Sequence, residues 1–309
     1  MATLSGDQQV QRIDQADDGW AWQNEDAAVL VMEVCKVRGQ TTVLAQDALA
    51  VEGPLEIRLQ HGPSSERQER SISVTMRTPG SDLELAIGFL LTEGVISDYN
   101  DFVSEDSAAF SGKPNEITIK LAESIELNLS TLERNFYTTS SCGICGKASI
   151  LALRSVCPPR HSNTLTVNAS LLFDLPQRLR AAQEKFERTG GLHAAGLFNK
   201  AGNLVILRED VGRHNAVDKL VGAASLADRL PLRDHILLLS GRASFELLQK
   251  AVMAGISMVV AIGAPSSLAV QVAKEFDITL VGFLRETHFN IYNGSERIRV
   301  SEAPIQETP

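Results

Sequence analysis

The sequence is short of cysteine, of aromatic residues and of positive charge. Its 309 residues include only four cysteines, and Phe, Trp and Tyr together make up 5%. Lys and Arg number 29 against 38 Asp and Glu, which gives a formal net charge of -9. Proteins that bind nucleic acid usually carry a basic excess, so we expect no nucleic acid partner. No apolar run is long enough to span a bilayer, so we expect no membrane partner.

Targeting signals are also missing from the first residues. This segment is polar and acidic, without the basic start and apolar stretch of a signal peptide. We therefore expect a cytoplasmic protein. In the cytosol, a close cysteine pair is more often catalytic or metal-binding than a structural disulfide. The cysteines to consider are Cys35, Cys142, Cys145 and Cys157.

The length and an apolar content of 44% are sufficient for two domains of ordinary size. Residues 1–25 and 301–309 are polar, and we expect both to be tails. Between them, the patterns predict an N-terminal α+β domain over 26–135, a cysteine loop over 136–147 and a C-terminal α/β domain over 148–300.

Alternating apolar residues in the N-terminal domain predict strands over 28–37, 49–59 and 71–77. A helical repeat of apolar residues follows. Ser81 and Glu84 have the spacing of a capping box at its start, where each side chain would bond to the other residue's backbone.

The C-terminal domain has short apolar segments that alternate with helical patterns. We predict strands over 236–239, 258–262 and 279–284, with helices over 245–254 and 268–276 between them. This alternation is typical of a parallel sheet covered by helices on both faces.

The most specific local motif is Cys142-Gly-Ile-Cys145-Gly-Lys147. The thiolate is the nucleophilic form of cysteine, and its pKa falls beside a cation or a helix N-terminus. Lys147 and a predicted helix directly follow the pair. Two glycines leave the loop free to move, which suits a group that must visit a donor and then an acceptor.

Three interpretations of this pair remain open from its residues alone. A structural zinc site needs four ligands, usually from two such pairs, whereas Cys35 and Cys157 are isolated. A thioredoxin-like dithiol normally sits at a helix start in a compact βαβ fold. A sulfur carrier would hold a persulfide on one cysteine while the other assists. The C-x-x-C spacing does not choose among them.

Three polar loops follow the predicted C-terminal strands, and ligands bind at that edge of open parallel sheets. Two of the loops lead into helices, whose free N–H groups favour phosphate. Arg242 and Arg285 offer planar guanidinium forks. Hydroxyl groups come from Ser240, Ser244, Ser266 and Ser267. Each serine alone is better explained as a helix cap, but the three loops together predict a dinucleotide-phosphate site.

The segment from Arg208 to Asn215 is unusually polar between apolar runs. Arg213 and His214 are candidates for binding a guanine nucleotide, and Asp210 or Asp218 for accepting from guanine N–H groups. The alternative is a charged cap for the following helix. A histidine in the position of His193 is often only a hydrogen-bonded interior residue, but its surrounding motif favours a functional role.

The choice among these interpretations comes from longer motifs. They are ELAIGFLLTEGVI, SSCGICGKAS, GGLHAAGLF, REDVGRHNAVDKLVG, SGRASFELLQKA, GAPSSLAV and TLVGFLR, in this order. Together they resemble the formate dehydrogenase accessory sulfurtransferase family (FdhD) over residues 28–300. The resemblance implies a cytidine-deaminase-like three-layer α/β sandwich with a smaller β-rich N-terminal domain, and a homodimer.

The resemblance also implies a reaction. Cys142 would accept persulfide sulfur from a cysteine desulfurase and pass it to a molybdenum (or tungsten) bis(molybdopterin guanine dinucleotide) cofactor, which formate dehydrogenase requires in sulfurated form. Cys145 matches the second cysteine of the family motif. The loop after the last predicted strand would contact the cofactor through Phe283, Leu284, Arg285, Glu286, Thr287 and His288.

Two other functions compete with sulfur transfer. Zinc deaminases use an H-x-E motif, whereas this chain has Ala195 in place of the glutamate, and Cys142 precedes His193 instead of following it. Deaminase chemistry is therefore not expected, and no metal site is predicted. The remaining rival is a chaperone that delivers the molybdenum cofactor without sulfur chemistry.

Overall fold

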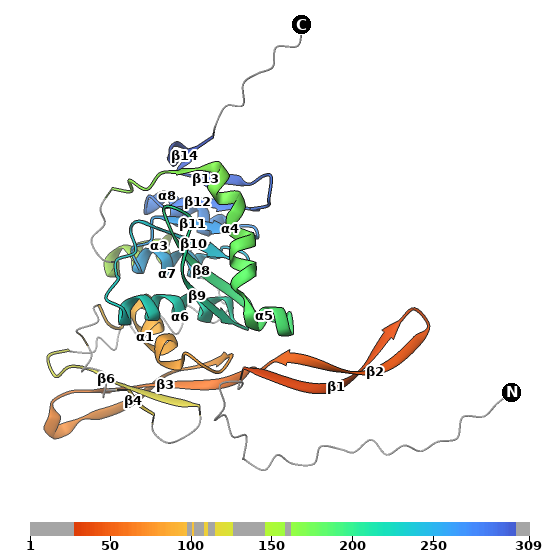
Figure 1. Ribbon diagram of the computed structural model, residues 1–309. Helices are drawn as coiled ribbons and strands as arrows, with labels where there is room; N and C mark the ends of the chain where they lie inside the picture. The colour runs from red at the N-terminus through yellow and green to blue at the C-terminus, as the bar shows by residue number, and fades with distance from the viewer. Residues whose placement is uncertain are drawn as a thin grey trace, which may run out of the picture.

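The computed structural model describes residues 28–97, 101, 108–110, 115–125, 146–157 and 162–300 (Figure 1). The N-terminal region contains a four-stranded sheet in the order β4-β3-β6-β5. Its strands are β3 (Gly53–His61), β4 (Gln68–Arg77), β5 (Ala108–Phe110) and β6 (Glu116–Lys120). A β-rich N-terminal region is thus confirmed.

A hairpin of two long strands precedes this sheet. Strands β1 (Val29–Arg38) and β2 (Thr41–Ala50) pair only with each other among the described strands, and Figure 1 shows them projecting away from the body. The prediction of one strand over 49–59 was wrong. The chain leaves the hairpin after Ala50 and starts β3 at Gly53, so the turn signal lies inside the predicted range.

Helix α1 (Asp82–Thr92) confirms the helix predicted after the third strand, but the capping box is wrong. Ser81 is the N-cap in a left-handed conformation (φ 57°), and its side chain makes no capping bond. Glu84 instead accepts two hydrogen bonds from Arg208, at 2.5 and 2.6 Å. A charge pair across the fold has replaced the local cap.

The larger sheet has six strands in the order β13-β12-β11-β10-β8-β9. Their bounds are β8 (His193–Asn199), β9 (Leu204–Asp210), β10 (His235–Leu239), β11 (Met258–Ala261), β12 (Thr279–Gly282) and β13 (Asn290–Asn293). Only β10, β11 and β12 run parallel, and the other pairings are antiparallel. The predicted parallel sheet is therefore a mixed sheet, because β8 and β9 form a hairpin that joins it at one side.

Helices cover both faces of this sheet. Leu237 and Leu239 point into a core with α6 (Arg213–Leu226), α7 (Phe245–Met253) and α8 (Ser267–Glu275). Ile236 and Leu238 point the other way, into a core with α4 (Ala169–Ala182). The alternation of side chains along a strand produces these two layers. The mixed α/β class is confirmed, and the deaminase-like assignment stays a prediction.

The remaining described elements lie at the margins of this layered body. Helix α3 (Gly146–Val156) follows the predicted cysteine loop, and α5 (Glu184–Thr189) extends from α4. Strands β7 (Val167–Asn168) and β14 (Ile298–Arg299) form a short parallel pair. None of the described helices has the length and apolarity needed to cross a membrane.

A single core joins the N-terminal sheet to the larger one. It contains Ile57 of β3 and Ile117 of β6 together with Leu197 of β8. Helices α1 and α6 lie between the sheets with their backbones in close contact. A β-carbon at Gly88 or Gly222 would fall 1.8 Å from a backbone oxygen of the other helix. The predicted division at residues 135 and 148 stays a prediction, although the two regions share this core.

Candidate functional site

One edge of the larger sheet collects the loops that the sequence singled out. The carboxyl ends of β9, β10, β11 and β12 meet there with the start of β8, because β8 runs antiparallel to β10. The backbone N–H of Ala194 donates to Oγ of Ser240 at 2.8 Å. Gly241 lies against the ring of His193, since a β-carbon at Gly241 would be 3.4 Å from its Nδ1. His193 and the loop after β10 are therefore neighbours.

Backbone hydrogen bonds tie the three loops of this edge together. Gly263 N–H donates to Gly241 O at 2.9 Å, and Phe283 N–H donates to Gly263 O at 3.0 Å. Ser266 N–H donates to Ala243 O at 2.9 Å. Loops that share such bonds hold their positions without help from a ligand. The edge is thus a preformed surface, which lowers the entropic cost of binding.

His214 lies at this edge, on the first turn of α6. Its Nε2 is 3.3 Å from Oγ of Ser244 and 3.9 Å from a carboxylate oxygen of Glu246. Burial, together with the positive charges of Lys250 and Arg213, lowers the pKa of His214 to about 4. The ring is neutral at neutral pH, so it exchanges hydrogen bonds without adding charge to the site.

The pKa of His193 is lowered as well. Burial and the charge of Arg213 lower its pKa, while Asp210 opposes the shift. A neutral imidazole has one donor and one acceptor nitrogen. Two neutral histidines therefore give this edge hydrogen-bond donors and acceptors without adding charge.

Arg213 carries a buried hydrogen-bond donor at this edge. Its Nε is buried and has no hydrogen-bond partner among the described residues. A buried donor without a partner costs free energy, which an anionic group bound beside it would recover. Arg242 is exposed close by in the loop after β10. Both arginines fit a phosphate-bearing ligand.

The loop after β12 contains exposed side chains, which could contact a ligand, and one buried side chain, which could not. Phe283 is 40% exposed and has a left-handed backbone (φ 54°), while the side chain of Leu284 is 1% exposed in the core. The prediction that Leu284 contacts the cofactor is therefore wrong for its side chain, which is buried and supports the loop. The exposed members are Arg285, Glu286, Thr287 and His288.

Arg285 is partly committed to its own loop. Its Nη1 donates to the carbonyl oxygens of Ile262 at 2.7 Å and Leu284 at 2.8 Å. Its backbone N–H donates to His288 O at 2.9 Å, which closes the loop. The rest of the guanidinium is exposed and can still offer donors to phosphate.

Ser266 acts as a helix cap, which is the simpler of the two roles predicted for the serines of these loops. It is the N-cap of α8, and its Oγ accepts from Ala269 N–H at 3.1 Å. Ser267 is the first helical residue, one position before the start of the predicted helix over 268–276. Ser244 makes no capping bond, and its Oγ lies 3.3 Å from Nε2 of His214.

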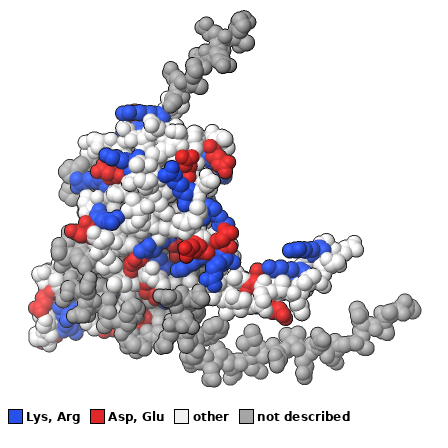
Figure 2. Space-filling view, in the orientation of Figure 1, with Lys and Arg blue, Asp and Glu red and all other residues white. Residues whose placement is uncertain are grey.

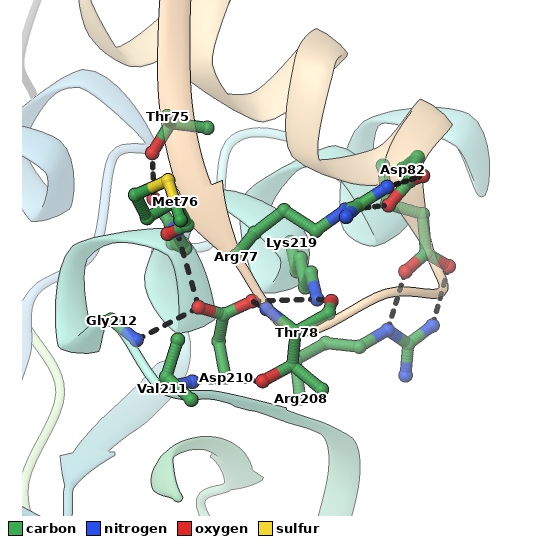
Figure 3. A network of polar contacts seen from close by, with 12 residues as sticks. Thr75, Met76, Arg77, Thr78, Asp82, Arg208, Asp210, Val211, Gly212 and Lys219 are labelled. Atoms are coloured by element: carbon green, nitrogen blue, oxygen red, sulfur yellow. Dashed lines mark hydrogen bonds and ion pairs between the residues drawn. The ribbon is translucent and has the colours of Figure 1, made fainter. Parts of the chain in front are cut away.

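Asp210 does not face the site, contrary to prediction (Figure 3). It is fully buried, and Oδ2 lies 2.7 Å from Nζ of Lys219 and 3.0 Å from the Thr78 N–H. Oδ1 accepts from the Gly212 N–H at 2.8 Å. Both oxygens are occupied within the protein, so Asp210 fixes the turn before α6 and joins it to the end of β4.

Asp218 is also buried away from the site, contrary to prediction. It is buried between Thr92, whose Oγ1 donates to it at 2.7 Å, and Lys250, whose Nζ is 2.9 Å away. Burial raises the pKa of Asp218 to about 6, against the effect of Lys250. Burial would lower the pKa of Lys250, but Asp218 and Glu93 together raise it. These groups connect α1, α6 and α7, and guanine has no access to them.

A cavity of about 1050 Å³ opens at the opposite edge of the sheet. Its lining includes Ser97, Val156, Asp234 and Ser257, and none of the predicted site residues. Cys142 and Cys145 lie outside the described residues. Helix α3 starts at Gly146, the residue after Cys145. In the described part of the chain, no group of three His, Cys, Asp or Glu side chains could hold a metal ion.

Comparison with known proteins decides the family. The FdhD/NarQ family model matches residues 50–299. The chain belongs to the FdhD/NarQ family. A relative named sulfur carrier protein FdhD, from Streptomyces coelicolor, is 49% identical over 278 residues, which cover 88% of this chain and 96% of the relative. A protein of the same name from Sulfurisphaera tokodaii is 40% identical over 86% of this chain and 98% of its own length.

The fold of this FdhD/NarQ chain also matches a solved structure. A crystal structure described as a formate dehydrogenase accessory protein from Desulfotalea psychrophila has a TM-score of 0.68 and 23% identity. The match covers 88% of this chain and all of that one. It supports the mixed α/β architecture with a β-rich N-terminal region.

Two lysines of this FdhD/NarQ member escaped the sequence analysis. Lys219 and Lys250 are 2% and 3% exposed, and each pairs with a buried aspartate. Both stand among apolar residues on the inward faces of their helices, next to Leu220 and Ala251. A lysine on an apolar helix face could have predicted a buried ion pair, because a buried charge requires a partner of opposite charge.

Proposed function

We propose that this chain is a cytoplasmic sulfur carrier that activates formate dehydrogenase. The observation that carries the proposal is the Cys142-x-x-Cys145 pair inside the matched range 50–299, in a chain 40–50% identical to proteins named as sulfur carriers. Cys142 takes sulfur from a cysteine desulfurase. The acceptor is a molybdenum bis(molybdopterin guanine dinucleotide) cofactor, which is the substrate of the transfer.

The first step is an exchange between a thiolate and a persulfide. The Cys142 thiolate attacks the terminal sulfur of the desulfurase persulfide. The bond between that sulfur and the desulfurase cysteine breaks, which leaves a desulfurase thiolate and a persulfide on Cys142. No net oxidation occurs. Lys147 and the start of α3 lie next to the pair in sequence, and both favour the thiolate.

The second step needs an acceptor held near the loop, and the sheet edge supports such binding. Arg213, Arg242 and Arg285 can donate to the phosphates of the guanine nucleotide arms. The neutral rings of His193 and His214 add hydrogen bonds without charge. The unpartnered Nε of Arg213 is the strongest support for an anion at this position.

Cys145 supplies a route for release. Its thiolate attacks Sγ of Cys142, a disulfide forms, and the terminal sulfur leaves as hydrosulfide for the metal. The two thiols provide the two electrons that reduce the sulfane sulfur. A cellular thiol reductant then restores the dithiol. This step rests on the C-x-x-C spacing, which permits such a disulfide.

Mass spectrometry after incubation with a cysteine desulfurase and cysteine tests the proposal. We expect the Cys142 peptide to gain one sulfur atom, and the gain to disappear in Cys142→Ala. Cys35→Ser is the matched control, because Cys35 is an exposed thiol far along the chain. An unmodified Cys142 peptide would reject the carrier role. Retention of the molybdenum cofactor without any adduct would favour the delivery chaperone.

A further inference from the structure

Thr78, the first residue after β4, is fully buried against the segment that ends β9 and starts α6. Its N–H donates to Oδ2 of Asp210 at 3.0 Å, and its Oγ1 accepts from the Val211 N–H at 3.2 Å. Its carbonyl oxygen accepts from Nζ of Lys219 at 2.8 Å. Figure 3 shows Thr78 among these three residues. All the polar groups of one N-terminal residue therefore bond to the segment that carries part of the candidate site.

The end of β4 makes a second contact with this segment. Asn215, on the first turn of α6, is 8% exposed, and its Nδ2 donates to Met76 O at 2.7 Å. Its Oδ1 accepts from Oγ1 of Thr75 at 3.2 Å. The bonds that reach Val211 and Asn215 lie on either side of Arg213 in the sequence. The end of β4 thus fixes the backbone both before and after Arg213.

The junction between β4 and α1 is held in place by an ion pair. Arg77 is 3% exposed and makes a bidentate contact with Asp82, with Nε to Oδ1 at 2.9 Å and Nη2 to Oδ2 at 2.8 Å. Nη2 also donates to Oδ1 of Asn115 at 3.2 Å. Bidentate pairs of this kind add geometric precision as well as energy. Thr78 is therefore a fixed point to which the start of α6 is attached.

The overall charge of the chain gives an anionic ligand little help. The formal net charge is -9, and Figure 2 shows Lys and Arg interspersed with Asp and Glu on the described part of one face of the body. A negative protein does not attract phosphate over a long range. Binding at the edge therefore depends on where a few donors are placed.

We propose that Thr78 is a positioning residue for Arg213 and His214, through which the N-terminal sheet sets the affinity of the edge for a guanine nucleotide. The inference rests on the proposed function, because it takes this edge as the acceptor site. Hydrogen bonds to phosphate weaken steeply when the donor turns away from its best direction. Thr78 is buried, so it acts through the backbone of Val211 and not by touching the ligand.

Isothermal titration calorimetry of the full chain with guanosine diphosphate tests the proposal. Thr78→Val keeps the shape of threonine but removes the oxygen that accepts from Val211, and the dissociation constant should rise about tenfold. Thr78→Ser keeps the hydroxyl and should bind within about twofold of wild type. Equal losses of affinity in the two variants, or no loss in Thr78→Val, would overturn the proposal.

Thr279→Val is the matched control for a loss of stability alone. Thr279 is fully buried at the start of β12, on the opposite edge of the sheet, and its Oγ1 accepts from Nη1 of Arg297 at 3.2 Å. This variant should have a lower urea midpoint and an unchanged dissociation constant. Weakened binding here, to the same extent as in Thr78→Val, would assign the effect to general destabilisation and reject a positioning role.

Thr75→Val provides a milder second variant, because Thr75 is only partly buried and loses a single bond to Asn215. Its dissociation constant should rise about threefold. If Thr78→Val does not fold, wild-type affinity in Thr75→Val rejects the proposal. The sulfur adduct on Cys142 is measured on the same proteins. A wild type that gains sulfur but does not bind guanosine diphosphate rejects the positioning role alone, whereas absence of the adduct with the expected affinities rejects only the carrier role.

Discussion

The carbonyl oxygen of Asp218 on α6 lies so close to Gly88 of α1 that a β-carbon at position 88 would be 1.8 Å from it. Gly222 stands in the same relationship to Glu84 of α1. Two glycines on facing helices thus set the distance between the N-terminal sheet and the larger sheet. No side chain can enter between them, and the helices cannot accommodate one without separating.

Gly88→Ala should lower the free energy of unfolding by about 3 kcal/mol or more, because the new methyl group overpacks a backbone contact. Urea denaturation followed by circular dichroism measures the change. Gly191→Ala is the control. Its β-carbon would meet Ala50 at an ordinary 3.5 Å, so its effect should stay below about 1 kcal/mol. Equal losses for both substitutions would contradict the close helix contact.

Lys219→Met should destabilise the fold by about 3–5 kcal/mol, because it leaves the fully buried Asp210 carboxylate without its cation. The same substitution at Lys274, an exposed residue of α8, should cost less than about 0.5 kcal/mol. Denaturation curves of both variants give the comparison. If Lys219→Met were as stable as the control, the ion pair would not hold the turn before α6.

His214 should make stability depend on pH. Its pKa in the folded protein is about 4, below the ordinary 6.5, so the folded state binds fewer protons than the unfolded state between these values. Its contribution is present above pH 6.5 and lost as pH falls through 4. Urea midpoints measured at pH 7 and pH 4.5 should differ more for wild type than for His214→Gln. An equal pH dependence would show that the ring is not held neutral.

Arg213→Gln should weaken the binding of guanosine diphosphate by about 10- to 100-fold, the effect of losing one charge-assisted hydrogen bond. Isothermal titration calorimetry provides the dissociation constant. Arg229→Gln, an exposed residue beyond α6, is the control and should bind like wild type. Undiminished binding by the Arg213 variant would remove the sheet edge from the acceptor site.

Cys145→Ala should still acquire sulfur on Cys142 but should activate formate dehydrogenase at least about tenfold less well, because the release step lacks its attacking thiolate. Labelled sulfur bound to the protein and formate-dependent dye reduction measure the two steps separately. Wild-type activation by this variant would eliminate the disulfide route, while the carrier role of Cys142 would stand.

The elements with regular periodicity could be predicted from the sequence. Helix α1 and the strands β10, β11 and β12 were predicted within a few residues, because short apolar runs and helical repeats depend on local pattern. Strand β2 (Thr41–Ala50) was missed. Its alternation is weak because both of its faces carry apolar residues.

Pairings between distant residues could not be predicted. Glu84 has the spacing of a capping box, but Arg208 takes its carboxylate, 124 positions along the chain. Asp210 and Asp218 look available in sequence, yet each is satisfied by a lysine on a helix. The loops at the sheet edge were located correctly in sequence because strand ends mark them, whereas the burial of Leu284 depends on the packed core.

Helix α6 has consequences for how the two regions respond to each other. Its first residue is Arg213 at the candidate binding edge, and its middle is locked to α1 through backbone contact. A helix packed in this way moves as one rigid body, so a shift of its first turn also shifts its contacts with α1. Amide hydrogen exchange in β3 and β4 should therefore slow when a nucleotide occupies the edge.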